Sequence, residues 1–191
     1  MLPASTNSVQ YLQQGPSSAG SQGPVKLNAE VIEGQDKERH VLFLHGLFGK
    51  AQSFQFLAKA KDIQKNYTCH LLDMRNHGAS QRDTLMDYES MARDIKGYMD
   101  SAGLTSSKQG VTLVGHSLGA KTAMTFAAMF PDLVHRLVSL DASPVDRRAM
   151  PHLNESSERM IEEAIRLGSL EGMGLKNAIK KIKSEVKDEV L

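Results

Sequence analysis

The stretch that decides the fold of this 191-residue chain reads Val111-Thr112-Leu113-Val114-Gly115-His116-Ser117-Leu118-Gly119. It opens with a short apolar run of strand length, and a helical pattern then continues from Ser117 to Phe130. Gly115 and Gly119 permit a tight turn between the two, because the ends of such a turn touch and leave no room for side chains. This context predicts that the Ser117 hydroxyl stands above a sheet edge as a candidate nucleophile. The alternative is a chance match to the pattern Gly-x-Ser-x-Gly.

The same alternation of strand and helix extends to both sides of this stretch. A second helix is predicted from Tyr88 to Met99, where apolar residues recur at helical spacing and Asp87 is placed to cap the start. Short apolar runs predict five strands, at residues 25–32, 40–44, 67–72, 111–114 and 137–140. Strands that alternate with helices at these lengths predict an α/β fold with a mostly parallel sheet and flanking helices. In such sheets function gathers at the carboxyl ends of the strands.

Composition excludes several function classes. The chain carries 23 Lys and Arg against 22 Asp and Glu, a net charge of +1, which disfavours a nucleic-acid partner. No window approaches the roughly 20 apolar residues of a membrane-spanning helix. The single cysteine, Cys69, cannot form an internal disulfide and is expected to be a small core residue. No Cys/His cluster has the spacing of a zinc site, so we expect neither a metal nor another cofactor.

Three regions are expected along the chain. Residues 1–24, rich in Ser, Gln, Gly and Pro, predict a disordered arm. Residues 25–150 predict the α/β core, and residues 151–191 contain two charged amphipathic segments that predict the start of a helical cap. The arm has neither the basic start and apolar run of a secretory signal nor the arginines of a mitochondrial transit peptide. The cytoplasm is the default location, and a mitochondrial location stays open.

A second glycine-rich turn follows the predicted strand at residues 40–44. It reads His45-Gly46-Leu47-Phe48-Gly49. At a neighbouring strand end, this turn could aim the Leu47 N–H at the point that the Leu118 N–H also faces. Two such donors form an oxyanion hole, which stabilises negative charge on a reacting carbonyl oxygen. The alternative is an ordinary strand-to-helix turn.

Together these motifs resemble the α/β-hydrolases, and in particular the esterase group that includes abhydrolase domain-containing protein eleven and its bacterial relatives. The resemblance covers about residues 25–190 and rests on five motifs in register, at residues 45–49, 73–80, 115–119, 121–124 and 141–144. It implies hydrolysis of small-molecule carboxylic esters or thioesters by a Ser-Asp-His triad, without a cofactor and under a helical cap. By this resemblance Ser117 is the nucleophile, Gly115, His116 and Gly119 complete the elbow around it, and Leu47 and Leu118 supply the oxyanion donors.

The triad has a candidate acid, but none of the histidines of this chain is a candidate for its base. The resemblance implies that Asp141, which follows the strand at 137–140, is the acid; a simple cap of the turn before Pro144 is the alternative. In this family the base follows the last strand, beyond Leu191. None of the seven histidines takes that place, and we expect structural or solvated roles for His40, His45, His70, His77, His116, His135 and His152.

Two functional hypotheses follow. In the first, the chain is part of a serine esterase whose last strands and catalytic histidine are missing from it. In the second, it is a catalytically inactive short form that acts as a binding or regulatory module. Under either hypothesis the apolar strand at 137–140 is expected to form an uncovered sheet edge.

Overall fold

The computed structural model describes residues 23–107 and 109–145. The predicted arm, apart from its last two residues, and the predicted cap at 151–191 lie outside these residues. In chain order the elements are β1 (Ala29–Ile32), β2 (His40–Leu44), η2 (Ala51–Phe54), α1 (Gln55–Ala58), α2 (Lys61–Asn66), β3 (Thr68–Leu72), α3 (Tyr88–Ser101), η3 (Leu104–Ser106), β4 (Val111–His116), α4 (Leu118–Met129), η4 (Pro131–Leu133) and β5 (Val134–Leu140).

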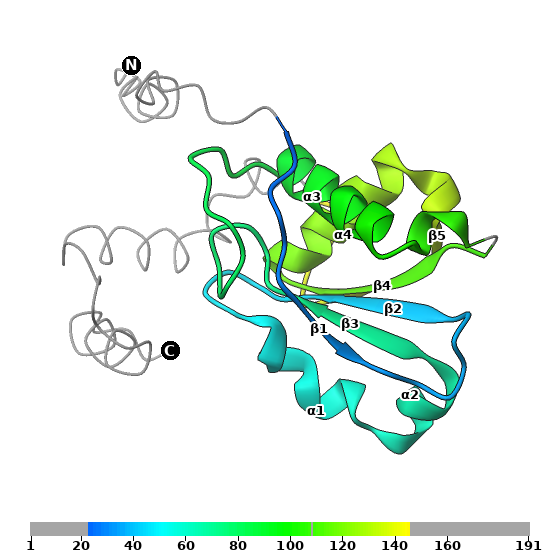
Figure 1. Cartoon of the computed structure of the whole chain (residues 1–191). Helices are drawn as coiled ribbons and strands as arrows, with labels where there is room; N and C mark the ends of the chain where they lie inside the picture. Colours follow the sequence, from blue (N-terminus) through cyan, green and yellow to red (C-terminus); the bar gives the residue numbers. More distant parts are fainter. Residues whose placement is uncertain (1–22, 108, 146–191) are drawn as a thin grey trace, which may run out of the picture. The chain divides into compact units, whose positions relative to one another are not determined.

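The strands form one mostly parallel sheet in the order β1-β3-β2-β4-β5. β2, β3, β4 and β5 run parallel to their neighbours, whereas β1 pairs antiparallel with β3. The parallel register aligns Leu44 of β2 with Leu72 of β3 and with Gly115 of β4. The carboxyl ends of these strands therefore share one edge of the sheet (Figure 1).

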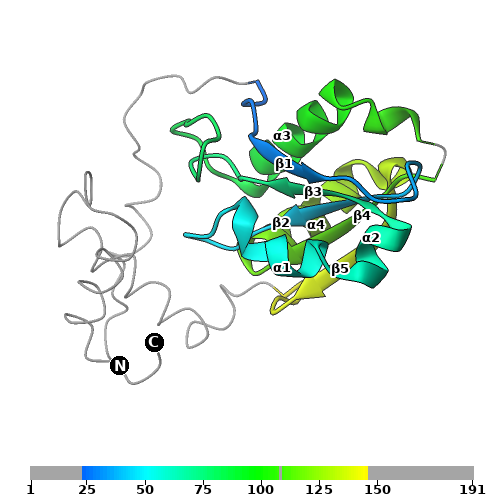
Figure 2. The same ribbon diagram turned by 60° about the horizontal axis from the view of Figure 1, so that its bottom comes forward.

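Helices cover both faces of the sheet. α3 and α4 lie on one face, and η2, α1 and α2 lie on the other (Figures 1 and 2). The core under α3 and α4 contains Leu42, Leu44 and Leu72, and the core under α1 contains Val41, Phe43 and Leu71. Successive residues of β2 and β3 thus point to opposite cores, which explains why these strands are apolar on both faces.

Most of the predicted elements are confirmed, with one correction at the first strand. The apolar run at 25–32 forms a strand only over Ala29–Ile32, and this strand runs antiparallel to β3. Val25 and Leu27 are buried nevertheless, as an extended segment beside α3. On α3 the predicted cap is confirmed, since the Asp87 carboxylate accepts a hydrogen bond of 2.6 Å from Ser90 N. Cys69 is fully buried in β3, as expected.

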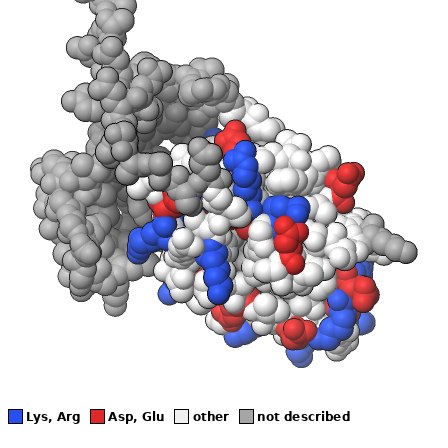
Figure 3. Space-filling view, turned by 45° about the horizontal axis from the view of Figure 1, so that its top comes forward, with Lys and Arg blue, Asp and Glu red and all other residues white. Residues whose placement is uncertain are grey.

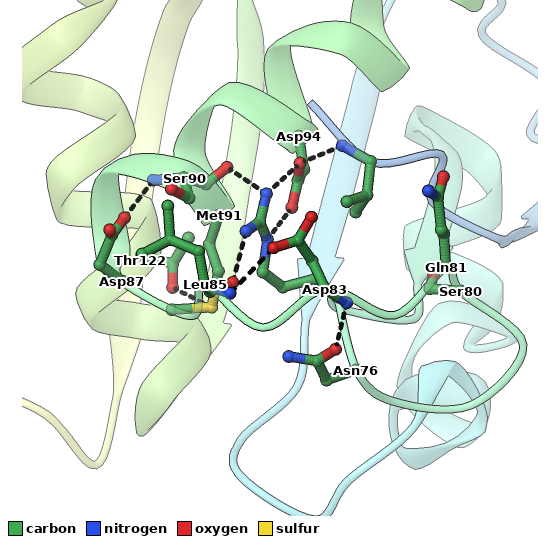
Figure 4. A network of polar contacts seen from close by, with 12 residues as sticks. Asn76, Ser80, Gln81, Asp83, Leu85, Asp87, Ser90, Met91, Asp94 and Thr122 are labelled. Atoms are coloured by element: carbon green, nitrogen blue, oxygen red, sulfur yellow. Dashed lines mark hydrogen bonds and ion pairs between the residues drawn. The ribbon is translucent and has the colours of Figure 1, made fainter. Parts of the chain in front are cut away.

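A buried ion pair joins α3 to the loop after β3 (Figure 4). Arg75 donates from Nε to Asp94 at 2.6 Å and from a terminal nitrogen at 2.8 Å, and both side chains are 1% exposed. Arg75 also donates to the carbonyl oxygen of Leu85, and Asp94 also accepts from Val25 N at 2.7 Å. The hydrogen bond and the charge of Asp94 raise the pKa of Arg75. The pair thus fixes the segment before β1 and the loop 75–87 onto one helix.

The turn between β4 and α4 brings backbone segments unusually close together. A Cβ atom on Gly119 would lie 2.2 Å from Leu44 O, and one on Gly115 would lie 2.5 Å from the Ala120 Cα atom. Real Cβ atoms do not approach backbone atoms to such distances. Glycine at both positions is therefore required for α4 to start where it does.

At the other end of the sheet from β1, β5 pairs on one side only among the described residues. Val138 and Leu140 on this strand are 43% and 36% exposed. No helix in residues 23–107 and 109–145 is long and apolar enough to cross a membrane.

We predict that Gly119→Ala destabilises the protein by at least about 3 kcal/mol, because the added methyl group meets the Leu44 carbonyl, which belongs to a central strand and cannot move away cheaply. Gly97→Ala in α3 is the matched control; its Cβ would lie 3.3 Å from Pro24 Cβ, and alanine favours the helix by about 1 kcal/mol. Chemical denaturation of both variants measures the difference. Equal stability of the two would mean that the β4–α4 turn is looser than described.

We also predict that Asp94→Asn lowers the free energy of unfolding by about 3–5 kcal/mol, because it leaves the buried Arg75 charge without its counterion. Asp100→Asn on the same helix removes an exposed carboxylate paired with Lys96, and should have little effect. Urea denaturation compares the two. A small, equal effect of both substitutions would contradict the structural role of the buried pair.

Candidate active site

Strained backbone marks one edge of the sheet. In the described residues, four non-glycine residues have a positive φ: Phe48 at 61°, Asn76 at 67°, Ser117 at 49° and Asp141 at 54°. They follow β2, β3, β4 and β5 respectively, so each lies just beyond the carboxyl end of a different parallel strand. Each such residue costs free energy, and strain of this kind tends to gather at functional sites. The edge predicted from the sequence to carry the chemistry is therefore the edge where the strain is found.

Ser117 occupies the centre of this edge. It is the residue before α4, with φ 49° and ψ −112°, and it is half-buried. Its N–H donates to Leu140 O at 3.0 Å, and its carbonyl oxygen accepts from Ala120 N and Lys121 N. Both backbone groups of Ser117 thus form hydrogen bonds, whereas Ser117 Oγ has no hydrogen-bond partner among the described residues. A hydroxyl held in this way, at the N-terminus of a helix, is available to react.

The loop between β2 and η2 lies against this serine. A Cβ on Gly46 would lie 2.7 Å from His116 Nδ1 and 3.3 Å from Ser117 Cβ, so glycine lets the loop approach without displacing these side chains. The next residue along is Leu47, one of the two predicted oxyanion donors. In the described part of the chain, neither Leu47 N nor Leu118 N donates a hydrogen bond. Two unpaired N–H groups on neighbouring loops could together bind an oxyanion.

Two histidines hold this loop in place. His45 Nε2 accepts from Met74 N at 3.0 Å, and its Nδ1 is 2.8 Å from Gly46 O. His77 Nε2 accepts from Phe48 N at 3.1 Å, and its Nδ1 is 2.9 Å from Arg75 O. Burial lowers the pKa of His45, although the bond to Gly46 opposes this, so that ring stays neutral and able to accept. The sequence expectation of structural roles for these two residues is confirmed.

Asp73 is a residue of the site to which the sequence assigned no role. It follows β3 and is 3% exposed. Its carboxylate accepts from Ala51 N at 2.7 Å, from Ala79 N at 3.0 Å and from the Asn28 amide at 3.0 Å. Burial raises the pKa of Asp73, but these hydrogen bonds together outweigh it, and the pKa lies below its usual value. This ionised carboxylate ties the end of the oxyanion loop to the loop after β3.

Asp141 lies beside the serine through the backbone. The hydrogen bond from Ser117 N to Leu140 O joins the two turns, and Ser139 Oγ donates to Ala142 O at 2.6 Å across the Asp141 turn. The Asp141 side chain is 89% exposed, and Oδ2 is 3.9 Å from His116 Nε2. The structure therefore brings Ser117, Leu47, Leu118 and Asp141 to one edge, with an exposed carboxylate that is open to a further partner.

No histidine in residues 23–107 and 109–145 hydrogen-bonds to Ser117. His45 and His77 use both ring nitrogens on the loops, as described above. His70 bonds to His40 and to Tyr98 inside the sheet, and burial and His40 lower the pKa of His70 to about 4. His116 is half-exposed and reaches only the neighbourhood of Asp141. His152 lies outside the described residues. The described residues also hold no group of three His, Cys, Asp or Glu side chains that could bind a metal ion.

Known proteins with similar sequences include a lipase, an esterase and an acetyltransferase by name. Mouse sn-1-specific diacylglycerol lipase ABHD11 is 38% identical over 130 residues, which is 68% of this chain and 41% of the relative. Esterase YbfF of Escherichia coli K12 is 34% identical over 130 residues, 67% of this chain and 49% of that enzyme. A probable alcohol acetyltransferase of the yeast Wickerhamomyces anomalus is 35% identical over 111 residues, 58% of this chain and 31% of that protein. The chain thus spans less than half the length of these relatives.

Solved structures point the same way. A marine microorganism esterase superposes with a TM-score of 0.70 at 29% identity, over 87% of this chain and 60% of that one. An esterase of Thermogutta terrifontis matches with a TM-score of 0.60 at 24% identity, over 75% of this chain and half of that one, which supports the fold alone. The α/β hydrolase fold family matches residues 39–176. From its sequence motifs, its sheet and these likenesses, this chain belongs to the α/β-hydrolase family.

Proposed function

We propose that this chain carries the nucleophile and the oxyanion hole of a serine hydrolase that cleaves carboxylic esters or thioesters through an acyl-enzyme on Ser117. One observation carries the proposal. The Ser117 hydroxyl is without a hydrogen-bond partner among the described residues, on a strained turn beside two N–H groups that are unpaired there. That arrangement has the parts required for attack on a carbonyl carbon and for stabilising the charge that results.

The proposed reaction has two steps. Ser117 Oγ attacks the acyl carbon and gives up its proton to a base, while the carbonyl oxygen becomes an anion that accepts hydrogen bonds from Leu47 N and Leu118 N. Collapse of this intermediate expels the alcohol or thiol, which takes the proton from the base, and leaves the acyl group on Ser117. Water then attacks the acyl-enzyme and gives a proton to the same base, the bond from the acyl carbon to Ser117 Oγ breaks, and Ser117 Oγ takes that proton as the carboxylic acid leaves. Each oxyanion donor is worth about 10²–10³ in rate.

Asp141 is the proposed acid of the triad. Its carboxylate is exposed at the catalytic edge, where it could accept a hydrogen bond from the N–H of a histidine ring that faces Ser117. Such a carboxylate holds the imidazole in the tautomer that accepts the serine proton. Because no described histidine hydrogen-bonds to Ser117, the proposed base is a histidine from outside the described residues.

The substrate class follows from the chemistry that the named relatives share. A diacylglycerol lipase, an esterase and an alcohol acetyltransferase all handle acyl groups bound to oxygen. We therefore place carboxylic esters first. Thioesters come second, since the same acyl-enzyme forms from either and only the leaving group differs. The proposed steps require no cofactor.

A second candidate function rests on the histidine contacts. His45, His70 and His77 use both ring nitrogens, and no described histidine reaches Ser117. A chain with a formed oxyanion hole but no base would bind acyl compounds without turning them over. This is the binding or regulatory module considered from the sequence, and the two predictions below separate it from the hydrolase.

We predict weak hydrolysis of p-nitrophenyl acetate by the purified chain, and its loss in Ser117→Ala. Without a positioned base the Ser117 hydroxyl is a weak nucleophile, so the rate should be far below that of a complete triad. Ser143→Ala, which removes another serine at the same edge, is the control and should keep the full rate. If Ser117→Ala and the unchanged chain hydrolyse the ester equally, Ser117 is not the nucleophile.

We predict that the base can be restored by fusing the carboxyl-terminal part of Esterase YbfF after residue 145. A positioned general base adds about 10²–10⁴ in rate, so the fusion should hydrolyse esters far faster than the chain alone. Asp141→Asn in the fusion should lose most of this gain, because asparagine cannot hold the imidazole in the working tautomer. Asp132→Asn, an exposed carboxylate in η4, serves as the control. A folded fusion that is indifferent to Asp141→Asn would remove Asp141 from the triad, and a folded but inert fusion would favour the binding module.

A further inference from the structure

An exposed apolar pair interrupts the surface of α1. Phe56 is 94% exposed and its neighbour Leu57 is 41% exposed, although α1 as a whole covers the sheet through Ala58, which is fully buried. Of the large apolar side chains in the described residues, Phe56 has the highest exposed fraction. A phenylalanine held almost wholly in water gains free energy from any apolar environment that covers it.

Four lysines flank this pair along the sequence. Residues 50–65 contain Lys50, Lys59, Lys61 and Lys65, all exposed, against the single acid Asp62, a net charge of +3. Phe56 and Lys59 border one shallow hollow of about 370 Å³, together with Gln55 and Ala60. The neighbouring carboxylate of Glu30 is occupied by the Gln55 amide at 2.8 Å. We call residues 50–65 with these exposed side chains the α1–α2 face.

The positive net charge of the α1–α2 face is not shared by the rest of the chain. The chain as a whole carries +1, so the rest of it is net negative. On the opposite side of the molecule, as Figure 3 shows, basic and acidic side chains lie interspersed. Figure 2 brings α1 and α2 to the front, where they cover their own face of the sheet.

We propose that the α1–α2 face binds the surface of an anionic lipid bilayer, with Phe56 and Leu57 inserted among the head groups and the lysines beside the lipid phosphates. Exposed aromatic and aliphatic side chains flanked by lysines have the composition of an interfacial membrane contact. A second copy of the chain is a poor occupant, because two faces of +3 repel. A nucleic acid would pair with the lysines, but it would make no favourable contact with the aliphatic side chain of Leu57.

A membrane contact at the α1–α2 face would also place the proposed active site near the lipid. The oxyanion loop at 46–49 runs directly into η2 and α1, so this face adjoins the edge that carries Ser117 (Figure 1). An enzyme docked by this face would hold that edge near the bilayer surface, where esters of low water solubility collect. The docking itself depends on the surface side chains alone and not on catalysis.

The test is sedimentation of the full chain with lipid vesicles. Vesicles of phosphatidylcholine alone are compared with vesicles of phosphatidylcholine and phosphatidylglycerol in equal parts, at low and at high salt. We expect binding to the anionic vesicles that weakens with salt. Phe56→Ser should lower the partition constant about tenfold. Lys59→Gln and Lys61→Gln should each lower it about fivefold.

Matched controls lie elsewhere on the fold. Val31→Ser removes a side chain that is 45% exposed on β1, and Lys26→Gln and Lys37→Gln each remove one exposed lysine outside the α1–α2 face. All three controls should bind like the unchanged chain. Equal loss in the controls, or no binding to anionic vesicles, would overturn the proposal. So would a dimer that Phe56→Ser dissociates while vesicle binding is unaffected, since the face would then belong to a second copy.

Discussion

The close approach of α4 to the ends of β2 and β4 is the constraint on which the site depends. Gly119 lies against the Leu44 carbonyl, and Gly115 lies against Ala120. The chain must therefore turn from β4 into α4 between these two glycines, at Ser117. The cost is a serine at φ 49°, and the Ser117 N–H bond to Leu140 helps to hold it there. The same turn exposes the hydroxyl, leaves the Leu118 N–H unpaired and brings the turn of Asp141 alongside. The proposed nucleophile, oxyanion donor and acid thus share one structural origin.

Side-chain hydrogen bonds, and not close packing, position the loop that carries Leu47, the other proposed oxyanion donor. His45 and His77 each accept one backbone N–H, and Asp73 accepts another at the far end of the loop. These are acceptors, so the two rings must be neutral and the carboxylate ionised. Burial keeps His45 neutral, and hydrogen bonds keep Asp73 ionised, which makes both suitable over the neutral pH range. The loop at Phe48 can then carry a positive φ without relaxing.

The parts of the fold that depend on local pattern were predictable from the sequence, and those that depend on distant partners were not. β2, β3, the capped start of α3 and the strand–turn–helix at Ser117 follow from residues that are neighbours along the chain. The antiparallel direction of β1 depends on its pairing with β3, and nothing within residues 25–32 encodes it. Asp73 binds Asn28, Ala51 and Ala79, so only the folded chain shows its role. The strain at Phe48 likewise has no sequence signal, since a phenylalanine rarely adopts a positive φ.

The central claim is that this turn alone makes Ser117 a selectively reactive nucleophile. The most direct measurement is peptide mass spectrometry after the chain has been treated with a fluorophosphonate, which modifies activated serines covalently. The account predicts one dominant adduct, on the peptide containing Ser117, because in residues 23–107 and 109–145 that hydroxyl lies at a helix N-terminus with two N–H donors beside it that are unpaired there. A uniform low level of modification over the exposed serines, or an adduct on another serine with Ser117 untouched, would contradict it.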